Sequence, residues 1–250
     1  MLSIELIEIM GAALIAGLMV ALTHAPLGIE VLKRGIIFID LAIAQIAGLG
    51  LVISGVIFHA PPWWAVQGSA ILFALLAGFF FRWIERKAPA QQEAIIGCSF
   101  VLAASITLLL LADHPHGGEE VQHLLSGQIL FISWSDILSH APVYACILLL
   151  WFSVPRIRQG IWFYVLFAAA ITSSVQLVGV YVVFASLILP ALAALGNKNP
   201  HQVAWLCGIL SIVAGIAISA YADLPAGPVL VITYVLICLT LKAKQVCLTR

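Results

Sequence analysis

Residues 35–50 read GIIFIDLAIAQIAGLG, an apolar run that contains only two polar side chains, Asp40 and Gln45. A run of this kind is typical of a helix inside a lipid bilayer. A carboxylate in such a helix is costly if it faces lipid, and ionisable groups at this depth usually face the protein interior or a watery path. The stretch therefore predicts a membrane-spanning helix and marks Asp40 as its most informative residue.

The rest of the chain has the same apolar character. Of its 250 residues, 63% are hydrophobic and only 9% are charged, and the mean hydropathy is +1.15. Soluble domains carry about 25% charged residues, so this chain has too few to cover a globular surface. The formal net charge is zero, which gives no basic face for nucleic acid. We expect an all-α, polytopic membrane protein in contact with lipid, with residues 1–250 forming one transmembrane domain.

Nine stretches have the length and composition of a membrane span, for which about 20 apolar residues cross about 30 Å of hydrocarbon. Eight spans remain an alternative, because only a polar notch from Thr172 to Gln176 divides residues 160–196. The apolar run at the N-terminus follows Glu5 and Glu8 rather than basic residues, so we expect a retained first span instead of a cleaved signal. The predicted spans are 4–23, 36–57, 64–82, 93–112, 137–154, 160–176, 178–196, 202–221 and 227–242.

Nine crossings separate the charges completely. The connections 58–63, 113–136 and 222–226 contain no Lys or Arg, and all basic residues fall on the other side. Adding or removing one crossing would mix the two sides. The positive-inside rule makes the basic side cytoplasmic, so we expect the N-terminus outside and the C-terminus in the cytoplasm. The basic residues are Lys33, Arg34, Arg82, Arg86, Lys87, Arg156, Arg158, Lys198, Lys242, Lys244 and Arg250.

Asp40 follows Arg34 by six residues, which is about 9 Å along a helix, and this places it near the cytoplasmic side of the hydrocarbon. Two interpretations are open: a group on a transport path, or a structural contact between helices. Gln45 lies about 140° around the helix from Asp40 and is expected to bond to a neighbouring helix. Ala44 shares the face of Asp40 but offers no ligand.

Two further features contain possible metal ligands. His24 precedes Pro26 near the inner end of the first span. It either approaches Asp40 or caps the helix by hydrogen-bonding to the backbone where Pro26 ends it. The predicted outer loop reads DHPHGGEEVQH, and imidazole and carboxylate groups suit first-row transition metals. An ordinary polar loop is the alternative. Its candidate ligands are Asp113, His114, His116, Glu119, Glu120 and His123.

Sequence motifs for catalysis are absent from the chain. It contains no GxxxxGK[ST] phosphate loop, no G-x-S-x-G nucleophile elbow and no HExxH zinc motif. We therefore expect a chain that is not itself an enzyme.

Five stretches in order resemble the membrane-permease subunit of metal-ion ABC importers of the zinc, manganese and iron type. The first contains a small-Pro-Leu-Gly element, a basic pair, an aromatic residue, an Asp and a Gly-ended helix, and the last contains an Asp-x-Pro-x-Gly-Pro turn. Together they extend along almost the whole chain. They are APLGIEVLKRGIIFIDLAIAQIAGLG (25–50), EAIIG (93–97), HLLSGQILFISWSDIL (123–138), VGVYVVFASLILPALAAL (178–195) and DLPAGPVLV (223–231).

The resemblance implies a multi-pass permease of the bacterial cytoplasmic (inner) membrane that dimerises around a translocation path. A cytoplasmic ATPase subunit would power it, and an extracytoplasmic metal-binding protein would deliver zinc or, next in order, manganese or iron. No permanently bound cofactor is implied. Asp40 would contact the metal, with Gln45 and His24 as candidate partners. The motif residues implied to be structural are Gly28, Arg34, Glu93, Gly97, Gly127, Gly179, Pro190, Asp223, Pro225 and Gly227.

Two positions depart from the family pattern. The family commonly has Asp-x-x-x-His in the second span, whereas here Ala44 occupies the position one turn after Asp40. The cytoplasmic loop that contacts the ATPase is reduced to residues 155–160, so coupling would pass through 82–93 or 196–201. These departures keep two other functions open: an ATPase-independent secondary transporter or channel, and a membrane scaffold that does not transport.

Overall fold

The computed structural model describes residues 4–58, 62–112, 125, 127 and 129–248. These described residues form helices and their connections, with no strand among them. Three short 3₁₀ turns join the longer elements: η1 (Pro89–Gln91), η2 (Ile129–Phe131) and η3 (Pro155–Arg158). The long helices are α1 (Ile4–Arg34), α2 (Ile39–Ile57), α3 (Trp63–Lys87), α4 (Gln92–Leu111), α6 (Trp134–Ser153), α7 (Gly160–Val178), α8 (Val180–Ala194), α9 (Pro200–Ala222) and α10 (Ala226–Leu248).

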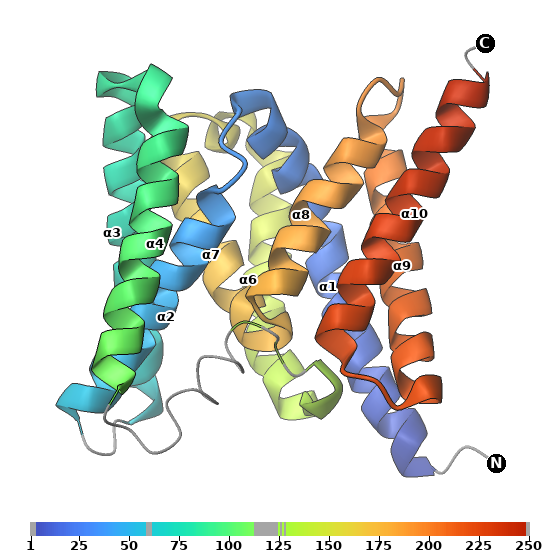
Figure 1. Cartoon of the computed structure of the whole chain (residues 1–250), viewed down its shortest axis with the longest axis horizontal. Helices are drawn as coiled ribbons and strands as arrows, with labels where there is room; N and C mark the ends of the chain where they lie inside the picture. Colours follow the sequence, from blue (N-terminus) through green and yellow to red (C-terminus); the bar gives the residue numbers. More distant parts are fainter. Residues whose placement is uncertain (1–3, 59–61, 113–124, 126, 128, 249–250) are drawn as a thin grey trace.

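Each of the nine predicted spans corresponds to one of these helices (Figure 1). Among the described residues, eight helices are long and apolar enough to cross a membrane. The ninth, α8, has 15 residues and is therefore only about 22 Å long, which is less than the thickness of the hydrocarbon. The all-α polytopic fold predicted from hydropathy is thus confirmed. The alternatives of eight and nine spans differ by the short α8.

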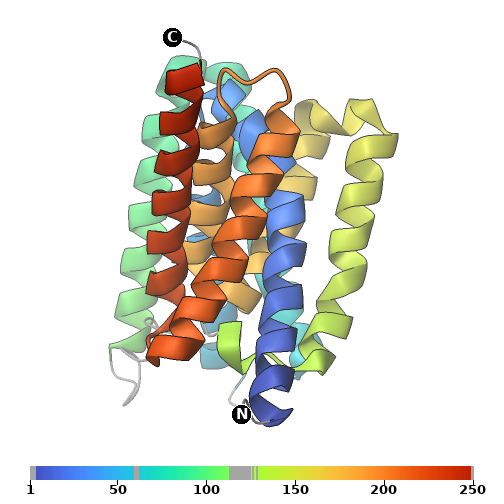
Figure 2. The same ribbon diagram turned by 90° about the vertical axis from the view of Figure 1, so that its right-hand side faces the viewer.

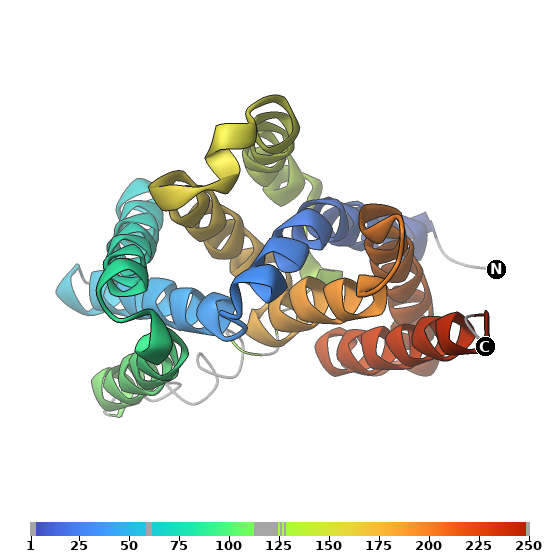
Figure 3. The same ribbon diagram turned by 90° about the horizontal axis from the view of Figure 1, so that it is seen from above.

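The helices divide into a buried group and a peripheral group. In the apolar stretches of α1, α2 and α7, between 67% and 72% of residues are buried inside the protein, whereas in α3, α4 and α6 the share is 22–28%. Viewed from above, α1, α2, α7 and α8 form the middle of the molecule (Figure 3). The side view shows α9 between α1 and α10 (Figure 2), and α9 contacts both helices. The poorly buried peripheral faces are left for lipid or for a partner.

Four connections between helices lie together at one end of the bundle, the upper end in Figure 1. These connections are 35–38, 88–91, 154–159 and 195–199. Every Lys and Arg in the described part of the chain belongs to one of them or to the last two turns of a helix. We call this end the basic end, and the opposite end, which includes the start of α3 and of α6, the outer end.

Pro26 does not end the first helix, contrary to the prediction from the sequence. It lies inside α1, which continues to Arg34. Proline lacks the N–H that would bond to the carbonyl four residues earlier, here that of Leu22. The indole N–H of Trp205 on α9 donates to this oxygen instead, at 3.0 Å. A neighbouring helix thus supplies the missing hydrogen bond, and α1 continues past Pro26 without a break.

The extension of α1 changes the position predicted for Asp40. Arg34 is the last residue of α1, and α2 begins at Ile39 after a break. Asp40 therefore lies one residue inside a new helix, so the estimate of about 9 Å along one continuous helix is wrong. The break contains Gly35, whose φ of 69° favours glycine.

The division between α7 and α8 also differs from the prediction. The polar notch from Thr172 to Gln176 lies inside α7, and the break occurs at Gly179, with φ 78° and ψ 163°. Only glycine adopts this conformation at little cost. Gly127 packs directly against the break, because a Cβ at this position would lie 2.2 Å from the carbonyl oxygen of Val178. Beside it, the side chain of Ile129 is buried, so this segment packs inward at the outer end below the short α8.

We expect Trp205→Phe to lower the thermal unfolding midpoint of the protein in detergent. The Leu22 carbonyl would lose its donor, and an unpaired acceptor costs about 1–3 kcal/mol, with no water available in hydrocarbon to replace it. In a Pro26→Ala background, the new amide of residue 26 can bond to Leu22, so the same Trp205 substitution should cost less. Equal losses in both backgrounds would mean that Trp205 acts through packing alone.

Candidate functional site

Asp40 is a carboxylate with no hydrogen-bond partner in the protein interior. Its side chain is 0% exposed, and neither Oδ1 nor Oδ2 has a hydrogen-bond partner among the described residues. The amides of Asp40 and Leu41 lie near the carboxylate, but they do not reach hydrogen-bonding geometry. They still provide the positive end of the α2 dipole. Since buried polar groups are nearly always paired, this carboxylate requires an explanation other than folding.

Glu93 supplies a second carboxylate at the same place. It lies in the first turn of α4, and its charge acts electrostatically on Asp40. Its Oε1 accepts a hydrogen bond of 3.1 Å from the backbone N–H of Phe38, just before α2, while Oε2 is buried without a partner. Two helix N-termini thus bring together two carboxylates with three unpaired oxygens, an arrangement suited to a cation.

The residues next to Asp40 on α2 add little to this pair. Ala44 is 1% exposed and packs in the core, so it offers no ligand, as the sequence predicts. Gln45 is buried, but its amide makes no hydrogen bond to another described residue, whereas the sequence predicts a bond to a neighbouring helix. A second carboxylate near Asp40 is therefore offered by Glu93 rather than by a residue of α2, a contribution that the sequence alone did not indicate.

His24 is fully engaged in a structural network. Its Nδ1 lies 2.7 Å from Ser186 Oγ on α8, and its Nε2 lies 2.9 Å from Ser174 Oγ on α7. Tyr144 on α6 contacts the same Ser174 hydroxyl at 2.8 Å. Both imidazole nitrogens are thus used to join α1 to its neighbours, and neither is left for Asp40. The structural alternative for His24 fits this geometry, although its partners are other helices rather than a helix end.

Arg34 joins several segments at the basic end. Its Nη2 donates to the Arg158 carbonyl at 2.7 Å, and its guanidinium lies 4.0 Å from the centre of the Phe163 ring. It also pairs with Glu30 at 3.1 Å and Glu85 at 3.4 Å. This fixes the end of α1 to α3, η3 and α7, immediately before the break that leads to Asp40.

The other motif residues have mainly structural surroundings. A Cβ on Gly28 would lie 1.9 Å from the Leu187 carbonyl, so glycine is required where α1 crosses α8. Asp223 ends α9 in the left-handed conformation with φ 52°, a region that Asp tolerates better than most residues. Gly127 and Gly179 form the contact described above. The remaining motif residues lie on helices or at their ends: Gly97 on α4, Pro190 inside α8, Pro225 just before α10 and Gly227 in its first turn.

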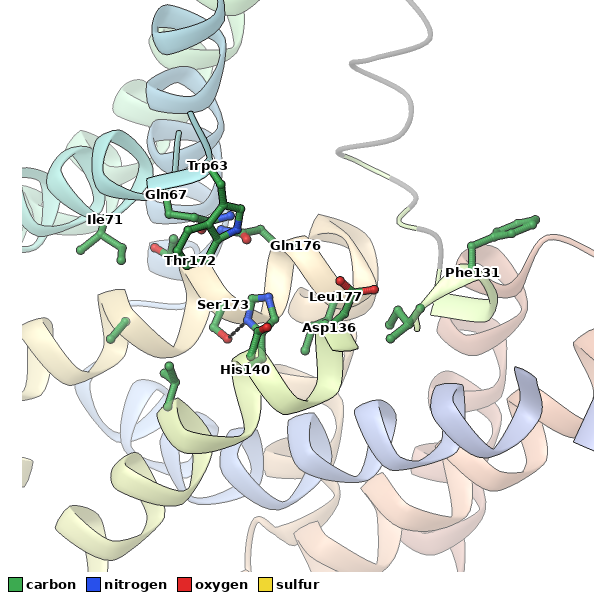
Figure 4. Close-up of a pocket in the computed structure, with 14 residues that line it drawn as sticks. Trp63, Gln67, Ile71, Phe131, Asp136, His140, Thr172, Ser173, Gln176 and Leu177 are labelled. Atoms are coloured by element: carbon green, nitrogen blue, oxygen red, sulfur yellow. Dashed lines mark hydrogen bonds between the residues drawn. The ribbon is translucent and has the colours of Figure 1, made fainter. Parts of the chain in front are cut away.

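The outer-loop candidates Asp113, His114, His116, Glu119, Glu120 and His123 lie outside the described residues. Within the described part of the chain, no three His, Cys, Asp or Glu side chains come together as a metal site. A pocket at the outer end instead contains Asp136 and His140, which the sequence interpretation did not identify (Figure 4). Their spacing of four residues on a helix was the available signal.

The comparison with known proteins agrees with the resemblance seen in the sequence. The model of the ABC 3 transport family matches residues 6–157 and 152–245, and the two matches meet at the short η3 connection. The chain is 24% identical to the high-affinity zinc uptake system membrane protein ZnuB of Haemophilus influenzae, covering 90% of this chain and 93% of that protein. It is 24% identical to the manganese transport system membrane protein MntC of Halalkalibacterium halodurans, with coverage of 95% and 89%.

A solved structure has the same fold. PsaBC from Streptococcus pneumoniae in complex with Fab aligns with a TM-score of 0.75 at 20% sequence identity, covering 96% of this chain and 95% of the other. At this identity the likeness concerns the fold alone: the arrangement of helices described above is also found in that structure.

We expect Asp40→Asn to raise the thermal unfolding midpoint of the metal-free protein. The substitution removes a buried, unpaired charge while keeping the side-chain shape, and such groups cost about 1–3 kcal/mol or more. Each kcal/mol corresponds to about 2–4 °C for a chain of this size. Glu30→Gln is the matched control, because it removes a carboxylate that pairs with Arg34 and should not stabilise. A midpoint lowered equally by both substitutions would contradict the assignment of Asp40 as an unsatisfied charge.

Proposed function

The chain belongs to the ABC 3 transport family, and from this premise we propose that it is the permease subunit of an ATP-driven importer of a divalent transition metal. Zinc is the first candidate for the cargo, followed by manganese or iron. The names of the zinc and manganese relatives support this cargo class. The observation that carries the proposal is the buried carboxylate of Asp40, whose two oxygens have no partner among the described residues.

The chemistry of the pair formed by Asp40 and Glu93 suits this cargo. A divalent cation loses favourable hydration when it enters hydrocarbon, and the cost is large unless anionic ligands compensate it. Two carboxylates supply a formal charge of −2 at the point where α2 and α4 begin. A cation bound there would neutralise both groups and pair the oxygens that are otherwise unsatisfied. Asp40 is then a temporary binding site on the translocation path.

Transport requires this site to open, because Asp40 has no exposed surface in the protomer. Two copies would form the translocation path between them, and a movement of α2 relative to α4 would expose Asp40 to it. The Phe38 amide, which donates to Glu93, lies at this junction and would change partner when the helices separate. ATP hydrolysis on the partner subunit would drive the exchange between the outward-open and inward-open states.

The expected assembly follows from the two ends of the bundle. The ATPase would bind at the basic end in the cytoplasm, through the connections at 82–93 and 196–201, because η3 is only four residues long. An extracytoplasmic metal-binding protein would dock at the outer end. In this proposal the protein lies in the bacterial inner membrane with its N-terminus outside, as the positive-inside rule predicts.

The proposal is tested by metal uptake into proteoliposomes that contain the permease, its ATPase and its metal-binding protein. Asp40→Asn should reduce ATP-dependent uptake of zinc, manganese and iron by at least about tenfold, the effect expected for losing about 1.4 kcal/mol of stabilisation. Asp223→Asn is the matched control, since Asn also tolerates the left-handed backbone and should transport normally.

Three outcomes of this experiment would count against the proposal. Normal uptake by Asp40→Asn would remove Asp40 from the path. Full uptake without ATP hydrolysis would favour a secondary transporter or channel. No uptake of any of the three metals by the complete wild-type system would contradict the metal-importer function itself.

A further inference from the structure

A pocket of about 520 Å³ opens between α3, α6 and α7 at the outer end, the end opposite Asp40. Figure 4 shows polar side chains from α6 and α7 directed into the same space, with Trp63 and Gln67 of α3 across from them. The volume exceeds that of a bare ion and accommodates one with bound water. The pocket is separate from the pair formed by Asp40 and Glu93, neither of which lines it.

Asp136 and His140 lie four residues apart on α6, so both face the pocket from one side of the helix. Asp136 also caps the helix: its Oδ2 accepts hydrogen bonds from the Ser133 backbone N–H at 2.9 Å and from Ser133 Oγ at 2.6 Å. The other oxygen, Oδ1, makes no hydrogen bond to a described residue. The cap holds the carboxylate in place and leaves one oxygen for a ligand.

His140 has the arrangement of a metal-binding histidine. Its Nδ1 lies 2.7 Å from Ser173 Oγ on α7 (dashed line in Figure 4). With the Nδ1 proton directed to this hydroxyl, Nε2 carries the lone pair and remains without a partner among the described residues. Metal-binding imidazoles commonly donate their other N–H in this way, which fixes both the tautomer and the ring orientation.

A third observation is independent of this pair. Thr172 lines the pocket and is 3% exposed, yet its Oγ1 has no hydrogen-bond partner in the described part of the chain. A buried hydroxyl without a partner is uncommon, and this one is completed by a ligand or its water in the pocket. Gln176 lies one turn further on the same helix and adds an amide oxygen to the lining.

We propose that this pocket is a receiving site for a divalent first-row transition metal, bound by Asp136 Oδ1 and His140 Nε2. Water and the neutral oxygens of Thr172 and Gln176 complete the coordination. The proposal rests on the proposed function, because it gives the metal a first stop on its way into the membrane. One carboxylate and one imidazole make a weaker site than three or four such ligands, and a transported ion must also be released.

The test uses the full-length chain in lipid nanodiscs without the ATPase, titrated with Co²⁺. Co²⁺ is followed by its visible absorption, and bound metal is counted after equilibrium dialysis. We expect His140→Ala and Asp136→Asn each to reduce the bound Co²⁺ by one per chain. Ser173→Ala keeps the ligands but loses the contact that orients His140. The same site should therefore bind Co²⁺ about 10-fold more weakly.

Two control variants separate ligand loss from damage to the fold. Ser133→Ala removes the cap partner of Asp136 but no ligand, so it should retain the stoichiometry. His201→Ala removes a histidine at the start of α9, at the basic end, and should bind as the wild type does. His140→Gln serves as a second, conservative variant if the alanine variant fails to fold. Equal Co²⁺ binding by wild type, His140→Ala and His140→Gln would overturn the proposal.

Failure of the receiving site can be distinguished from failure of the proposed function. If the wild-type transporter takes up metal but the His140 variants bind Co²⁺ as the wild type does, the receiving site is wrong and the importer stands. If the Co²⁺ site depends on His140 but the complete system takes up no metal, the site stands as a metal-binding site and the importer is wrong.

Discussion

The fold depends on one constraint of the bilayer: polar groups in hydrocarbon must find their partners inside the protein. Pro26 shows this constraint most clearly, because the carbonyl that it leaves free is completed by the Trp205 indole of another helix. The same principle explains the hydroxyls of Ser174 on α7 and Ser186 on α8, which bond to carbonyls of their own helices and to His24. Contacts of this kind fix the relative positions of helices that the hydrophobic effect alone could not orient, since lipid tails are as apolar as the side chains that face them.

Against this background, unsatisfied polar atoms point to function. His24 and Asp40 are both fully buried, and the sequence suggests metal binding for both. The structure separates them by their partners. His24 uses both ring nitrogens to join α1 to α7 and α8, whereas Asp40 uses neither oxygen. A buried carboxylate without partners destabilises the metal-free protein, and such a cost is retained where the group is needed for binding.

The hydropathy pattern predicts the nine helices because each span is a local property of about 20 consecutive residues. It fails where distant contacts decide the outcome. Pro26 is a helix breaker by its own chemistry, but Trp205, which compensates it, lies 183 residues away along the chain. The polar notch in α7 favours a break from the sequence alone, yet the hydroxyls of Ser173 and Ser174 are hydrogen-bonded and the chain turns at Gly179. Likewise, Glu93 is identified as a motif residue, but its place beside Asp40 depends on how α2 and α4 pack.

The two acidic clusters differ in chemistry and lie at opposite ends of the bundle. At the outer end, Asp136 and His140 combine one charge with one imidazole in an open pocket, which favours exchange with a delivering protein. Near the basic end, Asp40 is fully buried and Glu93 is partly buried. Two carboxylates at two helix N-termini would favour a cation that has lost its water. A cation moving from the first site to the second would exchange solvent and neutral ligands for carboxylates. The gain in electrostatic attraction would then compensate the growing cost of dehydration.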